Sequence, residues 1–437
     1  MTVSEAAHTL VLSTGDYTVA AGAGTTQSAL TWRWHVLAFV AAAGLVVSRR
    51  PDAIVHAQFF AEDGHVWFAD AYNRGWFTSL FRTQDGYFQT LPRLAAALSL
   101  LVPLSWAALV MNLIGLIIQI LPVPLLLSRR LSRLGSLQLR AALAFVYIAL
   151  PNCREMNVTI TEAQWHLALV ACLLLISSPP VTRVPKICDI LVFVLCGTTG
   201  PFAIPLALIA GVSLAFRRAR WGYWPLATFV CAGLIQTYAL FAIDSAARNH
   251  WPLGASAEWL IRILAGQVYL GTILGSNKFA VRAGMPFLVC VAIVGSTLMA
   301  YCFYKACLEW KLFLLFSLLL FAASLRSPMT LQPEHGNTVW QLIAQVPGIR
   351  YWFFPTLAFA WTLVWFLLST PSRQLCQIIG ATLLFVQLTG FVRDWRHPAY
   401  KDLHFASYAN ELTNAAPGTF ITFPENPKGW TFQLMKH

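Results

Sequence analysis

The feature that most constrains this fold is a series of apolar runs, each long enough to cross or nearly cross a lipid bilayer. A transmembrane helix needs about 20 predominantly apolar residues, and such runs recur from about 29–47 to about 378–391. Hydrophobic residues make up 57% of the 437 residues and charged residues 11%, against about 25% charged residues in soluble proteins. Because backbone polar groups in lipid must be satisfied within helices, the sequence predicts an all-α, polytopic helical membrane protein.

About eleven transmembrane helices are expected. The segment 91–102 is not counted, because it is short and flanked by prolines, which favours a helix lying along the membrane interface. The expected spans are about 29–47, 105–128, 139–150, 164–176, two short helices within 184–216, 224–243, 284–305, 312–325, 351–368 and 378–391.

The orientation follows from the arginine clusters at 129–133 and 217–220, which the positive-inside rule places in the cytoplasm. Arg49 and Arg50 oppose this orientation but are outnumbered. The expected parts are a disordered cytoplasmic tail (1–28), a membrane body (29–391) and a short external C-terminal segment (392–437). The expected external loops are 48–90, 151–163, 244–282 and 326–350.

The net charge of +12 is scattered between apolar runs and forms no basic domain. Membrane lipids are therefore the expected partners of these charges, and no nucleic-acid binding is expected.

The first external loop carries two adjacent carboxylates, Glu62 and Asp63, among aromatic residues such as Phe60 and Trp67. A carboxylate near a low-dielectric wall can act as general base on a hydroxyl group, and aromatic residues lie at membrane interfaces and stack on sugar rings. The alternative is an ordinary solvated loop or helix N-cap. We expect Asp63 to be the base, because at Gly64 the backbone can turn closely and leave room for an acceptor.

Other polar residues of the expected outer face are candidate substrate ligands. Arg350 and Tyr351 begin a late span, where an arginine can bind a lipid phosphate through a bidentate fork or simply snorkel to the interface. No residue spacing is diagnostic of a metal site and no cofactor motif is present, so the use of a divalent metal stays open. The remaining candidates are Arg154, Glu162, His166, Arg82, Arg93, Glu334 and His335.

This pattern resembles the GT-C superfamily of membrane glycosyltransferases, which includes the protein O-mannosyltransferases and the lipid A aminoarabinose transferase. The resemblance rests on a first span, a long external loop with Glu62-Asp63, an interfacial helix after it, many further spans, and Arg350-Tyr351 before a late span. It implies that an acidic residue of the loop is the base and that Arg350 holds the phosphate of a polyprenyl-phosphate-linked sugar.

The function that this resemblance implies is transfer of a hexose or pentose to an exported or lipid-linked acceptor, which can be a glycan, a lipid or a protein. The expected location is the bacterial inner membrane, with the active site on its periplasmic face, in the synthesis of cell-envelope polysaccharide. The alternatives are a lipid or oligosaccharide flippase or transporter, and a non-catalytic assembly subunit. A transporter should place ionisable residues near mid-span, whereas the expected spans are nearly free of acidic residues.

Overall fold

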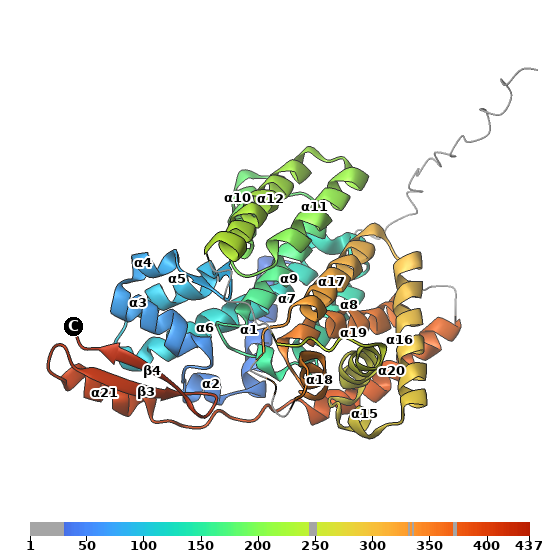
Figure 1. The fold of residues 1–437 in the computed structure, drawn as a ribbon. Helices are drawn as coiled ribbons and strands as arrows, with labels where there is room; N and C mark the ends of the chain where they lie inside the picture. Colours follow the sequence, from blue (N-terminus) through green and yellow to red (C-terminus); the bar gives the residue numbers. More distant parts are fainter. Residues whose placement is uncertain (1–29, 244–250, 331–332, 334–335, 370–373) are drawn as a thin grey trace, which may run out of the picture.

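The computed structural model of the chain describes residues 30–243, 251–330, 333, 336–369 and 374–437. These residues are mostly helical, with small two-stranded antiparallel sheets (Figure 1). Six of the described helices are long and apolar enough to cross a membrane, which supports a membrane-embedded helical protein. They are Leu104–Leu127, which contains α6 (Ala107–Ile120) and α7 (Pro122–Leu127); Arg220–Ile243, which contains α12 (Tyr223–Tyr238); α16 (Met285–Lys305); α17 (Leu308–Arg326); Arg350–Leu368, which contains α19 (Phe353–Leu368); and α20 (Gln374–Arg393).

These six helices coincide with six of the eleven expected spans. Three further apolar helices are shorter: α8 (Leu137–Ala149), α9 (Ala163–Ile176) and α11 (Ala203–Arg217). The two helices expected within 184–216 are α10 (Arg183–Gly197) and α11, but they pack mainly against α12 and not against each other as a tight hairpin. The first expected span is α1 (Trp32–Arg49), but three cationic or titratable residues, Arg33, His35 and Arg49, make it less apolar than the six. The described residues therefore support a multi-pass helical protein with six helices of spanning length.

One expected external loop, 244–282, is largely helical over its described residues 251–282. Within 244–282, α13 (Ala257–Arg262) continues through the π-helical turns Ile263–Leu270 into α14 (Gly271–Leu274). This helical segment packs against α16, α19 and α20, and Ala265, Val268 and Tyr269 are buried in it. Polar residues elsewhere in this segment led to the prediction of a loop, although one face of the helix is apolar. A short helix, α15 (Lys278–Arg282), follows.

The connections between helices gather at two opposite ends of the bundle. At one end, Arg130 forms a bidentate ion pair with Asp189 of α10, at 2.9 and 2.6 Å. Arg217 pairs with Glu309 of α17 at 2.8 Å at the same end, which we call the arginine end. The opposite end carries residues 50–90 and 393–437, and we call it the capped end (Figure 1).

The C-terminal segment covers the first long loop at the capped end. Phe59 of the loop contacts the rings of Phe405 and Phe432, at centroid distances of 5.1 and 5.6 Å. The Ala61 amide also donates to the Asn426 carbonyl at 2.6 Å. The loop contains α2 (Asp52–Val55), the π-helical turn Asp63–Phe68, α3 (Ala69–Arg74), α4 (Trp76–Leu80), β1 (Thr83–Gln84), β2 (Tyr87–Phe88) and α5 (Thr90–Ser99); the C-terminal segment contains α21 (Phe405–Asn414), β3 (Phe420–Glu425) and β4 (Trp430–Met435). A helix, α18 (Val339–Gln345), lies before α19.

Candidate functional site

A cavity of about 630 Å³ lies at the capped end. Its walls come from the first long loop, the start of α9, the residues just before α19, and the capped ends of α12 and α17. Four of the candidate catalytic and substrate-binding residues line it: Glu62, Glu162, Arg350 and Tyr351. Loops far apart in the sequence therefore bring these residues to one hollow.

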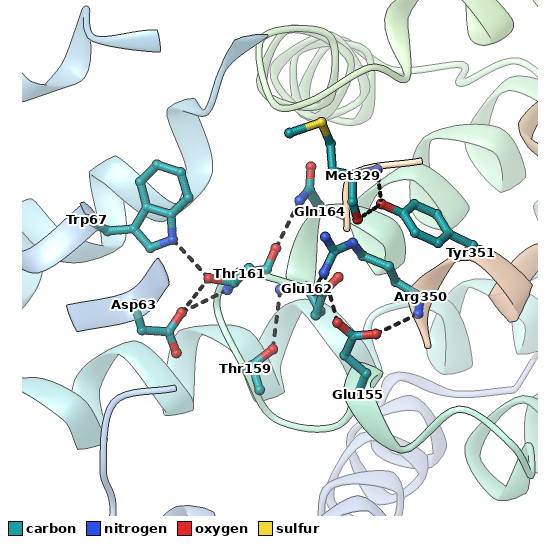
Figure 2. Close-up of polar contacts among 10 residues, drawn as sticks. All are labelled: Asp63, Trp67, Glu155, Thr159, Thr161, Glu162, Gln164, Met329, Arg350 and Tyr351. Carbon is teal, nitrogen blue, oxygen red and sulfur yellow. Dashed lines mark hydrogen bonds and ion pairs between the residues drawn. The ribbon is translucent and has the colours of Figure 1, made fainter. Parts of the chain in front are cut away.

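The adjacent carboxylates Glu62 and Asp63 lie in different surroundings. Asp63 is fully buried and does not line the cavity. Its Oδ1 accepts hydrogen bonds from the Thr161 amide at 3.1 Å and the Thr161 hydroxyl at 2.7 Å, and that hydroxyl in turn accepts from Trp67 Nε1 (Figure 2). Burial raises the pKa of Asp63 to about 8, although the hydrogen bonds from Thr161 oppose the rise. Glu62 lines the cavity, so the geometry favours Glu62 over Asp63 as the group that reaches a ligand.

The space beside Gly64 is not available to an acceptor, contrary to the sequence-based argument for Asp63. A Cβ atom on Gly64 would lie 2.2 Å from Glu425 Oε2 and 2.8 Å from Phe432 Cε1. The C-terminal strands therefore occupy this space. Glu425 Oε1 also lies 2.8 Å from His65 Nδ1; burial lowers the pKa of His65, but the hydrogen bond and charge of Glu425 outweigh it, so the net pKa is raised.

Arg350 lies between two carboxylates. Its Nη1 donates to Glu155 Oε1 at 2.8 Å and to Glu162 Oε1 at 3.1 Å, and its amide donates to Glu155 Oε2 at 2.8 Å (Figure 2). Burial raises the pKa of Glu162 well above its ordinary value; the Arg350 charge opposes this rise, and Glu155 and Glu62 add to it. The Tyr351 hydroxyl donates to the Met329 carbonyl at 2.7 Å. Arg350 and Tyr351 thus line the cavity with their polar groups already engaged within the protein.

Five polar atoms of cavity residues are buried and have no hydrogen-bond partner in the part of the chain that the structure describes. They are Glu62 Oε2, Gln89 Oε1, Glu162 Oε2, Gln164 Oε1 and Trp165 Nε1. Because unpaired buried polar atoms cost about 1–3 kcal/mol each, such a cluster is suited to a bound polar ligand. Four of the five are acceptors, which match the hydroxyl groups of a sugar or another polyol.

Arg326, at the end of α17, was not among the sequence candidates but lines the same cavity. It is exposed and makes no hydrogen bond or ion pair with any other described residue. The positive-inside rule makes a cation at the outer end of a span unusual, and this exception could have marked Arg326 as a candidate in the sequence.

The cavity also has an apolar flank. It is formed by Leu240 and Phe241 after α12 and by Leu320 and Ala323 of α17. The Phe241 side chain is 72% exposed, so this flank reaches the outside of the helix bundle.

Arg82 and Arg93 do not line this cavity. Both contact Asp70 Oδ2 at 3.2 Å, and Arg93 is fully buried, with its guanidinium over the Trp67 ring. They hold the first long loop together and offer little charge to a phosphate.

His166 is also absent from the cavity. Its Nδ1 lies 2.8 Å from the Tyr147 hydroxyl, and its Nε2 lies 2.8 Å from the Met156 carbonyl. With both ring nitrogens engaged in the core, His166 is a structural residue. Arg154 lines a second cavity, described below, and Glu334 and His335 lie outside the described residues.

No group of three or more His, Cys, Asp or Glu side chains that could hold a metal ion occurs within the described ranges. Neither the protein-family models nor the curated proteins include a match to this chain.

Proposed function

We propose that the protein is a membrane glycosyltransferase of the GT-C kind, which moves a sugar from a polyprenyl-phosphate donor to a hydroxyl group of an exported or lipid-linked acceptor. One observation carries the proposal: a single cavity combines acceptor-rich polar walls, an exposed cation and an apolar flank that reaches the outside of the bundle. A polyprenyl-phosphate sugar has the same three parts, namely hydroxyl groups, a phosphate and an apolar chain.

Each part of the donor has a counterpart in the cavity. The polyprenyl chain lies along Leu240, Phe241 and Leu320, because this contact removes apolar surface from water. The phosphate pairs with Arg326, because the guanidinium fork binds phosphate oxygens through charge-assisted hydrogen bonds. The sugar ring lies toward Glu162, where the partnerless oxygen accepts from its hydroxyl groups.

Glu62 is the proposed general base. Its carboxylate takes the proton of the acceptor hydroxyl while the oxygen bonds to the anomeric carbon, and the bond from that carbon to the phosphate oxygen breaks. The electron pair of the broken bond leaves with the polyprenyl phosphate, whose added negative charge lies beside Arg326. Such fixed positive charge stabilises the transition state because the charge develops there and not in the ground state.

Arg350 has a different proposed role from the phosphate ligand expected in the sequence. Since it already binds Glu155 and Glu162, it fixes the Glu162 carboxylate in the cavity wall. Arg350 is therefore a positioning residue, and Arg326 takes the phosphate.

The test compares Glu62→Gln and Arg326→Gln in proteoliposomes supplied with polyprenyl-phosphate sugars. Glu62→Gln should lower the turnover number about 10²–10⁴-fold while polyprenyl phosphate still binds, because the amide cannot take a proton. Arg326→Gln should mainly raise the donor KM. Glu411→Gln is the matched control, since Glu411 is exposed on α21 and is not among the cavity residues.

Normal transfer in Glu62→Gln would remove the base assignment. If wild-type protein showed no transfer but moved the lipid-linked sugar across the membrane, the flippase alternative would replace the enzyme. Polysaccharide assembly that needs the protein but is unaffected by Glu62→Gln and Arg326→Gln would favour a non-catalytic subunit.

A further inference from the structure

A second cavity, of about 400 Å³, lies at the capped end on the other side of the Glu155–Arg350 ion pair. Arg350 lines the first cavity and Glu155 lines the second, so this pair forms part of the wall between them. Segments from six parts of the chain surround the second cavity, including the end of α1, the residues after α20 and the turn between β3 and β4.

The charged residues of this cavity are strongly unequal in sign. Four cations line it and only one acid, Glu155, whose carboxylate oxygens both bind Arg350. The cations are Arg50, Arg154, Lys401 and Lys428.

Arg50 is the buried cation of the set. Its side chain donates from Nη1 to the Tyr400 hydroxyl at 2.6 Å, and its guanidinium lies over the Tyr400 ring at 4.4 Å. The residue is 4% exposed, and its Nε is buried with no hydrogen-bond partner among the described residues. A buried guanidinium with a free donor is costly unless a ligand supplies an acceptor.

The other three cations are exposed. The side chains of Arg154, Lys401 and Lys428 make no hydrogen bond or ion pair within the part of the chain that the structure describes. Clustered charges of one sign repel one another, and a low-dielectric wall strengthens the field that an incoming anion meets.

The walls of the cavity are held by specific contacts. The Asn426 side chain accepts from the Lys401 amide at 3.2 Å and donates to its carbonyl at 3.0 Å. The Gly348 amide donates to Asn152 Oδ1 at 2.9 Å, and a Cβ on Gly348 would meet Arg154 Cγ at 2.8 Å. The φ angle of Gly348 is +74°, which favours glycine, so this position both turns the loop and admits Arg154. These contacts fix the backbone of the cavity walls before a ligand binds, so the entropy lost on binding is mainly that of the exposed side chains.

We infer that this second cavity binds a phosphate group, through the Arg50 guanidinium and the three exposed cations. A phosphate offers several acceptor oxygens and up to two negative charges, which match a cation set of this size better than a single carboxylate. The phosphate belongs either to the headgroup of an anionic phospholipid or to a soluble phosphate compound. The inference stands apart from the proposed function, because none of the four cations lines the first cavity.

The experiment compares Arg154→Gln/Lys428→Gln with the control Arg393→Gln/Arg396→Gln, which also removes two exposed charges near the capped end but lies outside both cavities. One arm measures binding of inorganic phosphate to the purified protein by calorimetry. The other measures retention of phosphatidylglycerol, against phosphatidylcholine, by native mass spectrometry. Unliganded melting temperatures show that each variant is folded.

We expect either inorganic phosphate or phosphatidylglycerol to bind the wild type and the control with equal affinity. The same probe should bind the cavity variant at least about tenfold more weakly, because two charge-assisted contacts are lost. Weakened phosphate binding identifies a soluble ligand, and weakened phosphatidylglycerol retention identifies a lipid headgroup. Equal binding of both probes by the folded cavity variant and the control would overturn the inference. So would an absence of binding by the wild type.

Discussion

At the scale of single residues, two carboxylates that are neighbours in the chain have opposite roles in the structure. Glu62 lines the larger cavity with a free oxygen, whereas Asp63 is enclosed and bound by Thr161. Both were recognisable in the sequence as an acidic pair beside aromatic residues. Which of them meets a ligand depends on the π-helical turn Asp63–Phe68 and on the position of Thr161, nearly a hundred residues away.

Asp63→Asn tests the environment of the buried carboxyl. Asp63 has a folded-state pKa of about 8 against an ordinary value of 3.8, so the folded protein holds a proton that the unfolded chain releases between these values. Unfolding therefore releases a proton there, and stability from this group falls as the pH rises from about 4 to about 8. Each pKa unit corresponds to about 1.4 kcal/mol, so the fall is at most about 6 kcal/mol.

The asparagine variant should lose this pH dependence. It keeps an acceptor for Thr161 and carries no charge, so it should melt well above wild type at pH 8.5 and only slightly above wild type at pH 5. Thermal unfolding in detergent at the two values provides the measurement. The same change in melting temperature between pH 5 and pH 8.5 in both proteins would contradict a raised pKa at Asp63.

At the scale of elements, the C-terminal helix and hairpin complete the first long loop. The hairpin places Glu425 and Phe432 against Gly64, and it supplies Lys428 to the second cavity. The sequence contained no signal for this contact. Buried and exposed residues alternate along β3 and β4, but the surface that buries them belongs to a distant part of the chain. The sequence therefore predicted a separate C-terminal segment but not its packing against the first long loop.

Gly64→Ala tests this packing, with Gly44→Ala as the control. A Cβ at Gly64 would overlap Glu425 and Phe432, whereas a Cβ at Gly44 in α1 meets nothing within 4 Å. Overpacking of this kind costs about 1–3 kcal/mol, and in a helix alanine is about 1 kcal/mol more favourable than glycine. Gly64→Ala should therefore lower the melting temperature and speed proteolysis of the C-terminal segment, and Gly44→Ala should do neither. Unchanged proteolysis in Gly64→Ala would show that the hairpin is not held at this point.

At the scale of the whole molecule, the arrangement of the two ends accounts for the arginines that oppose the expected orientation. Arg49 and Arg50 are each 4% exposed. Arg49 donates to the carbonyls of Ile148 and Leu150 at 2.5 and 3.0 Å. These two charges are used inside the protein at the capped end, so they need not mark a cytoplasmic loop.

Topology can be tested with single cysteines in a background without exposed native cysteines. Arg218→Cys lies at the arginine end and Glu411→Cys at the capped end, and both positions are exposed. A membrane-impermeant thiol reagent added to intact cells should label Glu411→Cys and not Arg218→Cys, because the arginine end is expected in the cytoplasm. Labelling of both positions, or of Arg218→Cys alone, would reject the proposed orientation together with an external active site.

The sequence by itself determined the helical membrane class, the position of most apolar helices and the presence of polar residues at their ends. The length of an apolar run and the charges that flank it determine directly whether a segment spans a bilayer, so they can be recognised without a structure. The sequence also named Glu62, Glu162, Arg350 and Tyr351, which meet in one cavity.

Only the tertiary structure decided which charges remain free. Arg350 is bound by two carboxylates while Arg326 has no partner among the described residues, and Arg154 lies in a different cavity. The physical reason is that a charge is paired or free according to the groups within a few ångströms of it. In this protein those groups come from loops separated by up to several hundred residues.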